Sequence, residues 1–502
     1  MRLPARFGAV LAVVAGALLL RLASGVGFAN YDTLYALAWG GQLARGQAPE
    51  YEIPIAPTPH PLLEALGVVV SPLGPRAVES ATVALGFLAL AGCGWVCYRL
   101  GSEWFGRAAG VLAALLLLTR VPIVSYGVRA YADVPYLLLV LSALLVETRR
   151  PRAGAPVLAL LALAGLLRPE AGVFSALYWL YLLPRRLLPW RPWASTAGAH
   201  TREHGARPAG HTAEASTPRT RRQLAALALL AGAAPLVWLL SDLAVTGDPL
   251  WSLSNTRHTA HTLQRITGIA NVPQYIPRRI GEILRVPVLV GAALGGVLSL
   301  LWLRPRALVG AVAGVTAVGV FIVFATAGLP INTRYGFLAA AILCIFCGAG
   351  VFGWRRLRPG DPRRPWWMAA GVLVGVALLA YGPAQYRSLH RELDKLARQQ
   401  RIQGDLRALV DHRFITLRCG PVEVPNHAPI PLLALYLKTN PAKVVSAQVT
   451  TISAGEYLDP AGREVERDYV LDPHDPYLPV SVPPGFTEAH ANRSWRIFQR
   501  CG

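Results

Sequence analysis

Residues 30–62, NYDTLYALAWGGQLARGQAPEYEIPIAPTPHPL, directly follow the first hydrophobic segment and decide how the chain is organised. They place one carboxylate, Asp32, at the end of that segment and continue through an amphipathic helix pattern over residues 33–46. They end in a proline-rich loop with His60 just before another apolar run. A carboxylate at a membrane boundary is costly unless it is solvated, paired or functional. An isolated aspartate is more often a helix-end residue that suits the helix dipole, so the rest of the chain must decide.

The composition indicates a membrane protein. The chain has 502 residues, of which 53% are hydrophobic and 15% are charged, and its mean hydropathy is +0.39. Repeated apolar runs of near-spanning length predict a polytopic helical protein. The net charge of +21 would suggest nucleic acid in a soluble protein, but here the arginines lie in short loops between apolar runs. We therefore expect membrane lipid and no nucleic acid as a partner. The high Ala, Gly and Arg content favours a bacterial source.

The hydrophobic segments predict about eleven transmembrane helices. The first has a basic start and no convincing cleavage site, so we interpret it as a retained span and not as a signal peptide. Arginines gather on alternate sides of the spans, and the positive-inside rule places that side in the cytoplasm. This predicts a cytoplasmic N-terminus and an extracytoplasmic C-terminus. Residues 190–222, rich in Arg, His, Ala, Thr and Pro, are predicted to be a disordered cytoplasmic loop. The predicted spans are 7–27, 77–98, 108–124, 133–147, 154–167, 170–183, 223–243, 286–303, 307–327, 336–353 and 367–383.

The number of spans depends on residues 154–183, which Arg168, Pro169 and Glu170 interrupt. A single span would place one of its two basic flanks outside, whereas a hairpin of two short helices places both flanks inside. We favour the hairpin, which puts the interrupting turn on the outer side. Each helix is shorter than the ~20 residues of a perpendicular span, so we expect it to pack against protein or to thin the bilayer.

The chain after residue 383 contains no membrane segment. It predicts a small extracytoplasmic α/β domain over residues 384–502, attached to a transmembrane catalytic domain over residues 1–383. Leucines and isoleucine over residues 389–409 indicate an amphipathic helix. Cys419 and Cys501 are the only cysteines of this domain, so an oxidising compartment favours a disulfide between them. Strand-like runs lie at 414–419, 443–448, 468–471 and 494–498, with a helix candidate at 431–437.

Ionisable residues at the predicted outer ends of the spans are the main evidence for function. Each has an ordinary interpretation when taken alone: Asp32 and Asp133 as helix caps, Arg334 as a snorkelling end residue, Arg129 as the partner of Asp133 in an ion pair, and His60 as a loop residue. Together on one side they predict a polar cavity at the outer membrane boundary. Arginines there suit a phosphate, and carboxylates suit proton abstraction from a hydroxyl. The full set is Asp32, His60, Arg129, Asp133, Arg168, Glu170, Asp242, Asp248, Arg257, His258 and Arg334.

The order of these residues resembles the GT-C superfamily of membrane glycosyltransferases. It most resembles the bacterial branch related to the protein O-mannosyltransferases and the lipid A aminoarabinose transferase. The shared pattern is an acid after the first span, a Y-A-L-A…L-A-R-G helix, a proline-rich loop, an R-L…F-G-R segment, a second acid, a hairpin with a basic tip and a late R-Y. The matching segments are Asp32, 35–38 with 43–46, 60–62, 99–100 with 105–107, 131–135, 167–170 and 334–335.

The resemblance implies an inverting transfer of a sugar from a polyprenyl-phosphate donor to an acceptor hydroxyl at the outer face of the plasma membrane. It implies that Asp32 is the general base and that Asp133 is a second catalytic carboxylate, which orients a basic residue or the acceptor. Mannosyltransferase and arabinosyltransferase activity both stay open, and the acceptor is a glycan, a glycolipid or a protein. The implied substrate-binding residues are His60, Arg129, Arg168, Glu170, Arg257, His258, Arg334 and Tyr335.

The sequence departs from the family pattern next to the implied base. Many relatives carry two adjacent acids in the first loop, but Thr33 follows Asp32 here. A metal bridged by such a pair is therefore not supported. No metal ligands and no other cofactor are predicted, although a divalent metal stays open.

Two functions of other classes compete with transfer. Intramembrane charges and broken helices also suit a lipid or sugar transporter or flippase, but the charges gather at one face, not at the midplane, and the sequence shows no internal repeat. A non-catalytic scaffold whose outer domain binds a partner is the second alternative. A scaffold should tolerate Asp32→Asn without any effect. Inactivation of a transporter should stop the movement of its substrate and should not remove a glycoconjugate.

Overall fold

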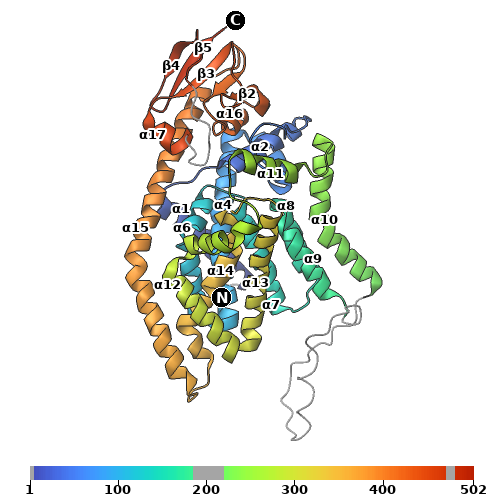
Figure 1. Cartoon of the computed structure of the whole chain (residues 1–502), viewed down its shortest axis with the longest axis vertical. Coiled ribbons are helices and arrows are strands. Elements are labelled where there is room, and N and C mark those ends of the chain that lie inside the picture. The colour runs from blue at the N-terminus through green and yellow to red at the C-terminus, as the bar shows by residue number, and fades with distance from the viewer. Residues whose placement is uncertain (1–4, 185–219, 471–480, 502) are drawn as a thin grey trace.

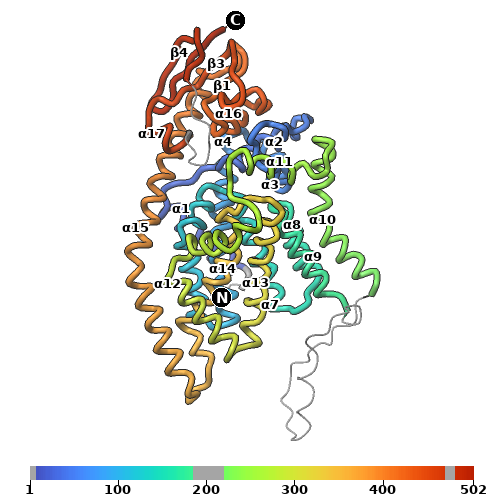
Figure 2. The backbone as a smooth tube through the Cα atoms, in the orientation of Figure 1, coloured from blue at the N-terminus to red at the C-terminus, as the bar shows by residue number. Residues whose placement is uncertain are grey.

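The structure, a computed structural model, describes residues 5–184, 220–470 and 481–501. These residues form a bundle of helices that carries a small five-stranded sheet at one end (Figure 1). Helix α15 (Arg363–Asp411) runs along the whole side of the bundle and joins it to the sheet, as the tube in Figure 2 shows. We call the end with the sheet the sheet end. All but the last residues of the predicted loop 190–222 lie outside the described residues.

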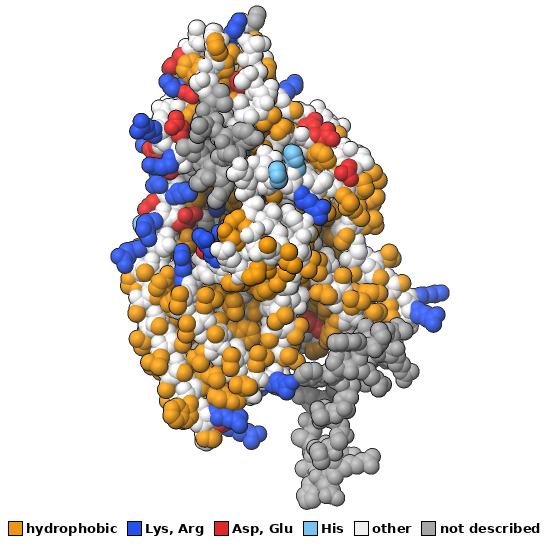
Figure 3. All heavy atoms as spheres, in the orientation of Figure 1, with side chains coloured by type: hydrophobic (Ala, Val, Ile, Leu, Met, Phe, Trp, Pro, Cys, Tyr) orange, Lys and Arg blue, Asp and Glu red, His pale blue; other side chains and the backbone are white. Residues whose placement is uncertain are grey.

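The chain is a multi-pass membrane protein. Among the described residues, seven helices are long and apolar enough to cross a membrane, and all seven coincide with predicted spans. Figure 3 shows hydrophobic side chains over the middle and lower part of one face, with Lys and Arg above them and at the lower edge. The seven helices are α1 (Ala5–Ser24), α4 (Pro75–Phe105), α10 (Arg221–Thr246), α12 (Val272–Trp302), α13 (Arg304–Thr326), α14 (Phe337–Phe352) and α15.

The other four predicted spans also fall on helices, but these are short or broken. Helices α5 (Arg107–Leu118) and α6 (Val121–Val128) meet at a 65° bend, so the predicted span over 108–124 falls on a bent pair of helices that together are apolar enough to cross a membrane. The break has a local cause, because Pro122 in the first turn of α6 has no N–H to donate to the Leu118 carbonyl oxygen, as a continuous helix would require. Helices α7 (Asp133–Arg149), α8 (Ala155–Leu167) and α9 (Glu170–Leu182) have 17, 13 and 13 residues.

The bundle packs around α14, whose residues are nearly all buried. Small residues allow this helix to approach its neighbours closely. A Cβ added to Gly295 of α12 would lie 1.9 Å from the carbonyl oxygen of Phe346, so the two backbones are in direct contact there. Such close packing through small residues is typical of helices in membranes, where apolar burial does not drive association.

Three helices cover the bundle at the sheet end: α2 (Tyr31–Ala44), α3 (Pro61–Val70) and α11 (Trp251–Thr262). The predicted helix over residues 33–46 is therefore present as α2, but it is not amphipathic in its environment. Its residues 33–42 are all buried. Helices α3 and α16 (Ile430–Tyr436) pack on it, and Trp39 joins a core cluster that also contains Leu406 and Trp495. The apolar surface that seals the sheet onto the bundle thus runs through α2.

The five strands form one mixed sheet in the order β2-β1-β3-β5-β4. Strand β1 pairs in parallel with β2 and β3, and β5 pairs antiparallel with β3 and β4. In the register, Val422 lies opposite Val444 and Glu456, and Tyr457 lies opposite Phe498. This confirms a small C-terminal α/β unit. The strands are β1 (Val422–Val424), β2 (Val444–Ser446), β3 (Gly455–Pro460), β4 (Thr487–Ala491) and β5 (Trp495–Arg500), with the short helix α17 (Arg463–Val465) after β3.

Two of the predicted strands are wrong. Residues 414–419 form an irregular loop, since Arg413 and Leu417 have φ values of 60° and 61° that a continuous strand does not accept. The described part of 468–471 lies in η7 (Glu466–Val470), a short π-helical turn. The runs at 443–448 and 494–498 contain β2 and β5, and the predicted helix at 431–437 is α16.

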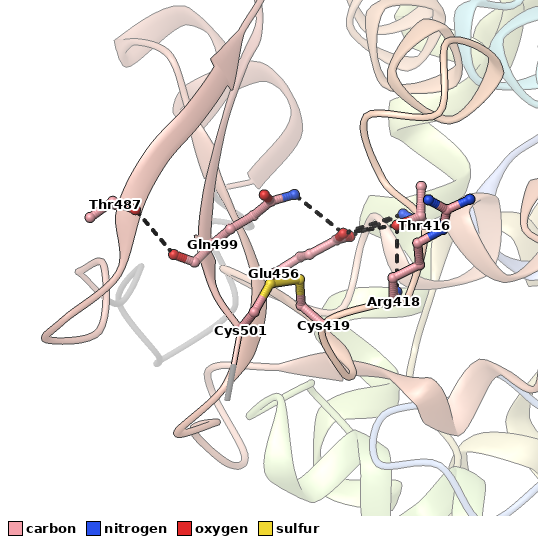
Figure 4. Close-up of a disulfide and its surroundings, with 7 residues drawn as sticks. All are labelled: Thr416, Arg418, Cys419, Glu456, Thr487, Gln499 and Cys501. Atoms are coloured by element: carbon pink, nitrogen blue, oxygen red, sulfur yellow. Dashed lines mark hydrogen bonds between the residues drawn. A yellow bond between two sulfur atoms is a disulfide. The ribbon is translucent and has the colours of Figure 1, made fainter.

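A disulfide joins Cys419 to Cys501, the pairing that the sequence favours (Figure 4). Their Cα atoms lie 4.6 Å apart across a sequence separation of 82 residues. Beside the bridge, the Glu456 carboxylate accepts hydrogen bonds from the Thr416 backbone N–H at 3.2 Å and from Gln499 Nε2 at 3.4 Å. The bridge and these bonds fix the loop 414–419 against β3 and β5.

Candidate functional site

A cavity of about 420 Å³ lies at the sheet end, below α11 and between the start of α2, the turn from α8 to α9, and the inner face of α10. The proline-rich loop before α3 forms one wall, and residues 329–335 before α14 form another. His427, from the loop before α16, closes it from the side of the sheet. The predicted site residues that line it are Asp32, His60, Arg168, Glu170, Arg334 and Tyr335.

Asp32 is held in place by the residues on either side of it. The Asn30 side chain caps α2 and accepts hydrogen bonds from the backbone N–H groups of Asp32 at 2.8 Å and Thr33 at 3.2 Å. Asn30 Nδ2 in turn donates to the carbonyl oxygen of Arg129 at 3.0 Å, and Thr33 Oγ1 donates to that of Ala130 at 2.8 Å. These bonds fasten the start of α2 to the segment that follows α6, so the Asp32 carboxylate faces the cavity from a rigid base.

Asp32 and Arg334 form an ion pair across the cavity. Arg334 Nη1 donates to Asp32 Oδ2 at 2.9 Å, and both side chains are 19% exposed. Arg334 comes from η4 (Thr333–Gly336), more than three hundred residues after Asp32 in the sequence. The Nε atom of Arg334 is buried and has no hydrogen-bond partner among the described residues, so one donor of this guanidinium is left for a ligand.

A second charged cluster forms the floor of the cavity at the turn between α8 and α9. Arg168 Nη1 donates to Asp133 Oδ1 at 2.6 Å, and Arg168 Nη2 donates to Glu170 Oε1 at 2.6 Å. The three side chains are at most 6% exposed. The ring of Tyr335 lies against the guanidinium, with its centroid 4.8 Å from the Arg168 Cζ. Asp133 does not line the cavity itself but contacts it through Arg168.

Burial and charge set the protonation of the cavity residues. Burial raises the pKa of Asp32, but Arg334 and His60 lower it, and the net result is a pKa below the ordinary value. Burial lowers the pKa of His60 to about 4, so its imidazole is neutral near pH 7. Its Nδ1 atom is buried without a partner among the described residues. His60 therefore meets a ligand as a neutral hydrogen-bonding group and not as a cation.

The cavity also contains Asp242, which belongs to the predicted set of ionisable residues but had no assigned role, and Arg265, which that set did not include. Arg265, just after α11, and Asp242, near the end of α10, both line it. The Asp242 carboxylate accepts hydrogen bonds from the Ser252 backbone N–H and from Ser252 Oγ, both at 2.8 Å, which ties α10 to α11. Asp242 carried a signal as an acid at an outer span end, whereas nothing in the sequence singles out Arg265 or His427. The charged lining is balanced: Arg168, Arg265 and Arg334 against Asp32, Glu170 and Asp242.

Besides Asp133, three more predicted site residues do not line the cavity. Arg129 packs its guanidinium against Tyr126 and Tyr131, with Cζ 5.3 Å and 4.9 Å from the ring centroids. Arg257 donates from Nε to the carbonyl oxygen of Ala327 at 2.6 Å. Arg257 and His258 are exposed on the outer surface of α11. In the part of the chain that the structure describes, no group of three or more His, Cys, Asp or Glu side chains is placed to hold a metal ion.

Comparisons with known proteins give a match in structure only. No family model matches the sequence, and no curated protein is detectably similar to it. ArnT from Cupriavidus metallidurans bound to undecaprenyl phosphate is similar with a TM-score of 0.54 and 15% identity, over 98% of this chain and 98% of that chain. The same protein in the apo state gives a TM-score of 0.52 and 16% identity, over 99% and 98%. The chain therefore shares its fold with ArnT, the fold that the resemblance to the GT-C superfamily predicts.

Proposed function

We propose that the chain is a membrane glycosyltransferase that moves a sugar from a polyprenyl-phosphate donor to an acceptor hydroxyl, with Asp32 as the general base. The observation that carries the proposal is the Asp32–Arg334 pair, which presents a carboxylate and a cation side by side in one cavity. The reaction needs both groups, because it removes a proton from a hydroxyl and leaves charge on a phosphate. The match to ArnT bound to undecaprenyl phosphate supports a donor of this class.

In the proposed reaction, the acceptor oxygen attacks the anomeric carbon of the sugar on the face opposite the phosphate. The bond between that carbon and the phosphate oxygen breaks, and its electron pair stays on the released polyprenyl phosphate. The acceptor proton passes to Asp32. Attack from the opposite face inverts the configuration at the anomeric carbon. The leaving phosphate is already an anion, so it needs stabilisation of its negative charge more than it needs a strong acid.

Arg334 links the base to the leaving group in this proposal. Its Nη1 holds Asp32, and its unpartnered Nε is free to donate to a phosphate oxygen. A bound phosphate then shares the positive charge that otherwise lowers the pKa of Asp32. The carboxylate becomes a stronger base only when the donor is present, which disfavours reaction without it. Arg265 supplies the second cation at the phosphate, because it lines the same cavity, helps to lower the pKa of Asp32 and forms no ion pair among the described residues.

The other predicted residues have supporting roles in the proposal. Arg168 is already held by both Asp133 and Glu170, and the three groups together carry a formal charge of −1, so Arg168 orders the floor of the cavity and does not act as a free cation for the phosphate. Arg129 supports Asp32 through its backbone carbonyl, which holds Asn30. Arg257 and His258, on the outer surface of α11, are placed to contact a long acceptor and not the donor phosphate.

The experiment is a transfer assay in liposomes with a panel of radiolabelled polyprenyl-phosphate sugars, including mannose and arabinofuranose donors, and a host membrane extract as acceptor. It compares the wild type with Asp32→Asn and with the matched control Asp248→Asn, a carboxylate outside the cavity lining. Loss of the base should slow transfer by about 10²–10⁴-fold, the usual contribution of general base catalysis. The control should transfer at the wild-type rate. Equal transfer by the wild type and Asp32→Asn would exclude Asp32 as the base, and lipid movement without transfer would indicate a flippase.

A further inference from the structure

A second hollow, of about 620 Å³, lies at the end of the bundle opposite the sheet end. It is bounded by the last turns of α4, the first turn of α5 and η5 (Gly353–Arg356). We call it the arginine hollow, because four arginines contribute to its lining. They are Arg99, Arg107, Arg355 and Arg356. The positive-inside rule assigns this end to the cytoplasm.

The positive charge of the arginine hollow is not balanced by the protein. Glu103 is the one carboxylate in its lining, and it is shared between Arg99 at 3.6 Å and Arg149 at 3.0 Å. Within the described ranges, neither Arg107 nor Arg355 forms an ion pair. Like charges in one concave site repel one another unless an anion joins them. The hollow therefore has an excess of positive charge that suits a bound anion.

The backbone adds to the attraction for an anion. Helix α5 begins inside the arginine hollow, where Arg107 and Ala108 are lining residues. No side chain caps this N-terminus, because the N-cap position is Gly106 with a φ of 103°. A Cβ built on Gly106 would lie 3.5 Å from Arg356 Nε, an ordinary contact distance, so the arginine lies beside the start of the helix. Free N–H groups and the positive end of the helix dipole favour a phosphate there.

Aromatic residues place the hollow at the boundary between membrane and water. The Arg99 Cζ lies 5.7 Å from the Trp95 ring centroid, and the Arg355 Cζ lies 5.6 Å from that of Phe352 and 5.4 Å from that of Trp354. Trp and Tyr gather at this depth in membrane proteins, where lipid headgroups lie. Phe352 lines the hollow together with Tyr98 and Phe105, and the glycerol and upper acyl chain of a lipid contact such side chains favourably, whereas a soluble anion gains nothing from them. Topology alone explains arginines at this end, but it does not explain their convergence on one concave, unpaired site.

We propose that the arginine hollow binds the phosphate of an anionic phospholipid headgroup. Basic pockets between transmembrane helices on the cytoplasmic side are a known way to hold such headgroups. The site is separate from the cavity at the sheet end and does not depend on the function proposed for it. The shared chemistry is a phosphate, which a lipid or a soluble anion would supply, and the structure favours the lipid.

The test is native mass spectrometry of the full-length protein in detergent, titrated with phosphatidylglycerol, with phosphatidylcholine and with inorganic phosphate. The variant Arg107→Gln with Arg355→Gln removes two unpaired charges from the hollow. Each arginine near an anionic headgroup strengthens binding by about fivefold, so the double variant should bind phosphatidylglycerol about 30-fold more weakly. The matched control, Arg363→Gln with Arg364→Gln, removes two charges at the same end but outside the hollow. It should change the affinity by less than about threefold, because surface charges outside a site are largely screened.

A second variant guards against misfolding. Ala108→Glu places a carboxylate in the first turn of α5, where the helix dipole favours it, and fills the hollow with a competing anion. It should abolish preferential binding of phosphatidylglycerol while the unfolding temperature without lipid stays at the wild-type value. Equal binding of the two lipids by the wild type, or undiminished binding by both variants, would overturn the proposal. Displacement of the lipid by inorganic phosphate at lower concentration than the lipid itself would reassign the site to a soluble anion.

Discussion

Replacement of Arg168 by methionine tests whether the floor of the cavity is held together by charge balance. Arg168 is 5% exposed and is bonded at 2.6 Å to both Asp133 and Glu170. Methionine replaces the aliphatic stem of arginine but lacks the guanidinium group and its charge. The variant Arg168→Met therefore leaves two buried carboxylates close together without a cation. One Glu170 oxygen, Oε2, has no hydrogen-bond partner among the described residues even in the wild type. The surrounding residues therefore offer few donors that could stabilise the two carboxylates once Arg168 is removed.

The expected cost follows from the burial of the cluster. Removal of one partner from a buried ion pair typically destabilises a protein by about 3–5 kcal/mol, because the remaining charge is uncompensated. A chain of 502 residues has an unfolding entropy of about 1 kcal/mol/K, so the unfolding temperature should fall by roughly 3–5 °C. The triple variant Arg168→Met, Asp133→Asn, Glu170→Gln removes all three charges. Replacement of a whole buried ion network by neutral groups is often without cost, so the triple variant should regain most of the loss.

The assay is thermal unfolding in detergent followed by tryptophan fluorescence. The matched control is Arg278→Met, which breaks an exposed ion pair with Glu282 in which Arg278 is 62% exposed. It should cost less than about 1 kcal/mol, because exposed pairs contribute little. The result that refutes the reasoning is a triple variant as unstable as Arg168→Met, since stability would then depend on the arginine side chain itself and not on charge balance. If the proposed function holds, transfer activity should be lost in both Arg168 variants, because both lack the guanidinium that orders the floor of the cavity.

Three further outcomes are expected. Burial lowers the pKa of His60 from about 6.5 to about 4, so the unfolded chain binds a proton at this histidine before the folded chain does as the pH falls. The free energy of unfolding should therefore keep its full value above pH 6.5 and should drop by up to about 3 kcal/mol by pH 4. His60→Asn should flatten this loss in unfolding curves recorded from pH 7 to pH 4.5, and an unchanged slope would contradict the shift. Glu79→Gln removes the carboxylate that accepts a hydrogen bond from Arg407 Nη1 at 2.8 Å and should lower the free energy of unfolding by about 2 kcal/mol. Proteolysis of the residues beyond α15 should then become faster. An unchanged rate would show that apolar contacts alone hold α15. Cys419→Ser opens a loop of 82 residues and should lower the free energy of unfolding by at most about 4–5 kcal/mol. The variant should unfold at a lower temperature, and a reductant should have the same effect on the wild type. An unchanged unfolding temperature would show that the bridge with Cys501 is dispensable.

Hydropathy and arginine placement predicted the helices of the bundle because both signals are local. Each apolar run must satisfy its own backbone in the membrane, so a helix follows from a single stretch of sequence. The hairpin interpretation of residues 154–183 rested on the basic flanks, and the structure brings its turn into the same cavity as Asp32. Pro122 is a local signal for the 65° bend between α5 and α6, but the continuous run of apolar residues over 108–124 favoured a single span in the sequence analysis.

The partners within the cavity were beyond the reach of the sequence. Asp32 was singled out by its place after a span, and Arg334 by its place before one, but their pairing depends on how α2 and α14 pack three hundred residues apart. Arg265 and His427 carried no signal, because each lies in a loop that only tertiary structure brings to the cavity. The burial of α2 was missed for the same reason. Its polar residues suggested a solvated face, whereas α3 and α16 cover it.

The shortness of α8 and α9 explains why the cavity lies where it does. Thirteen helical residues rise ~20 Å, whereas the hydrocarbon core is ~30 Å thick. If the basic flanks of the hairpin stay at one membrane face, its turn ends ~10 Å below the opposite face. Water does not solvate a charge freely at that depth, so Arg168 must find its partners in the protein, and Asp133 and Glu170 supply them. The same shortness leaves space above the turn, which α11 covers and the ionised groups line. In the proposed function, a recess of this kind would receive the phosphate of a lipid-linked sugar near the level of the lipid headgroups.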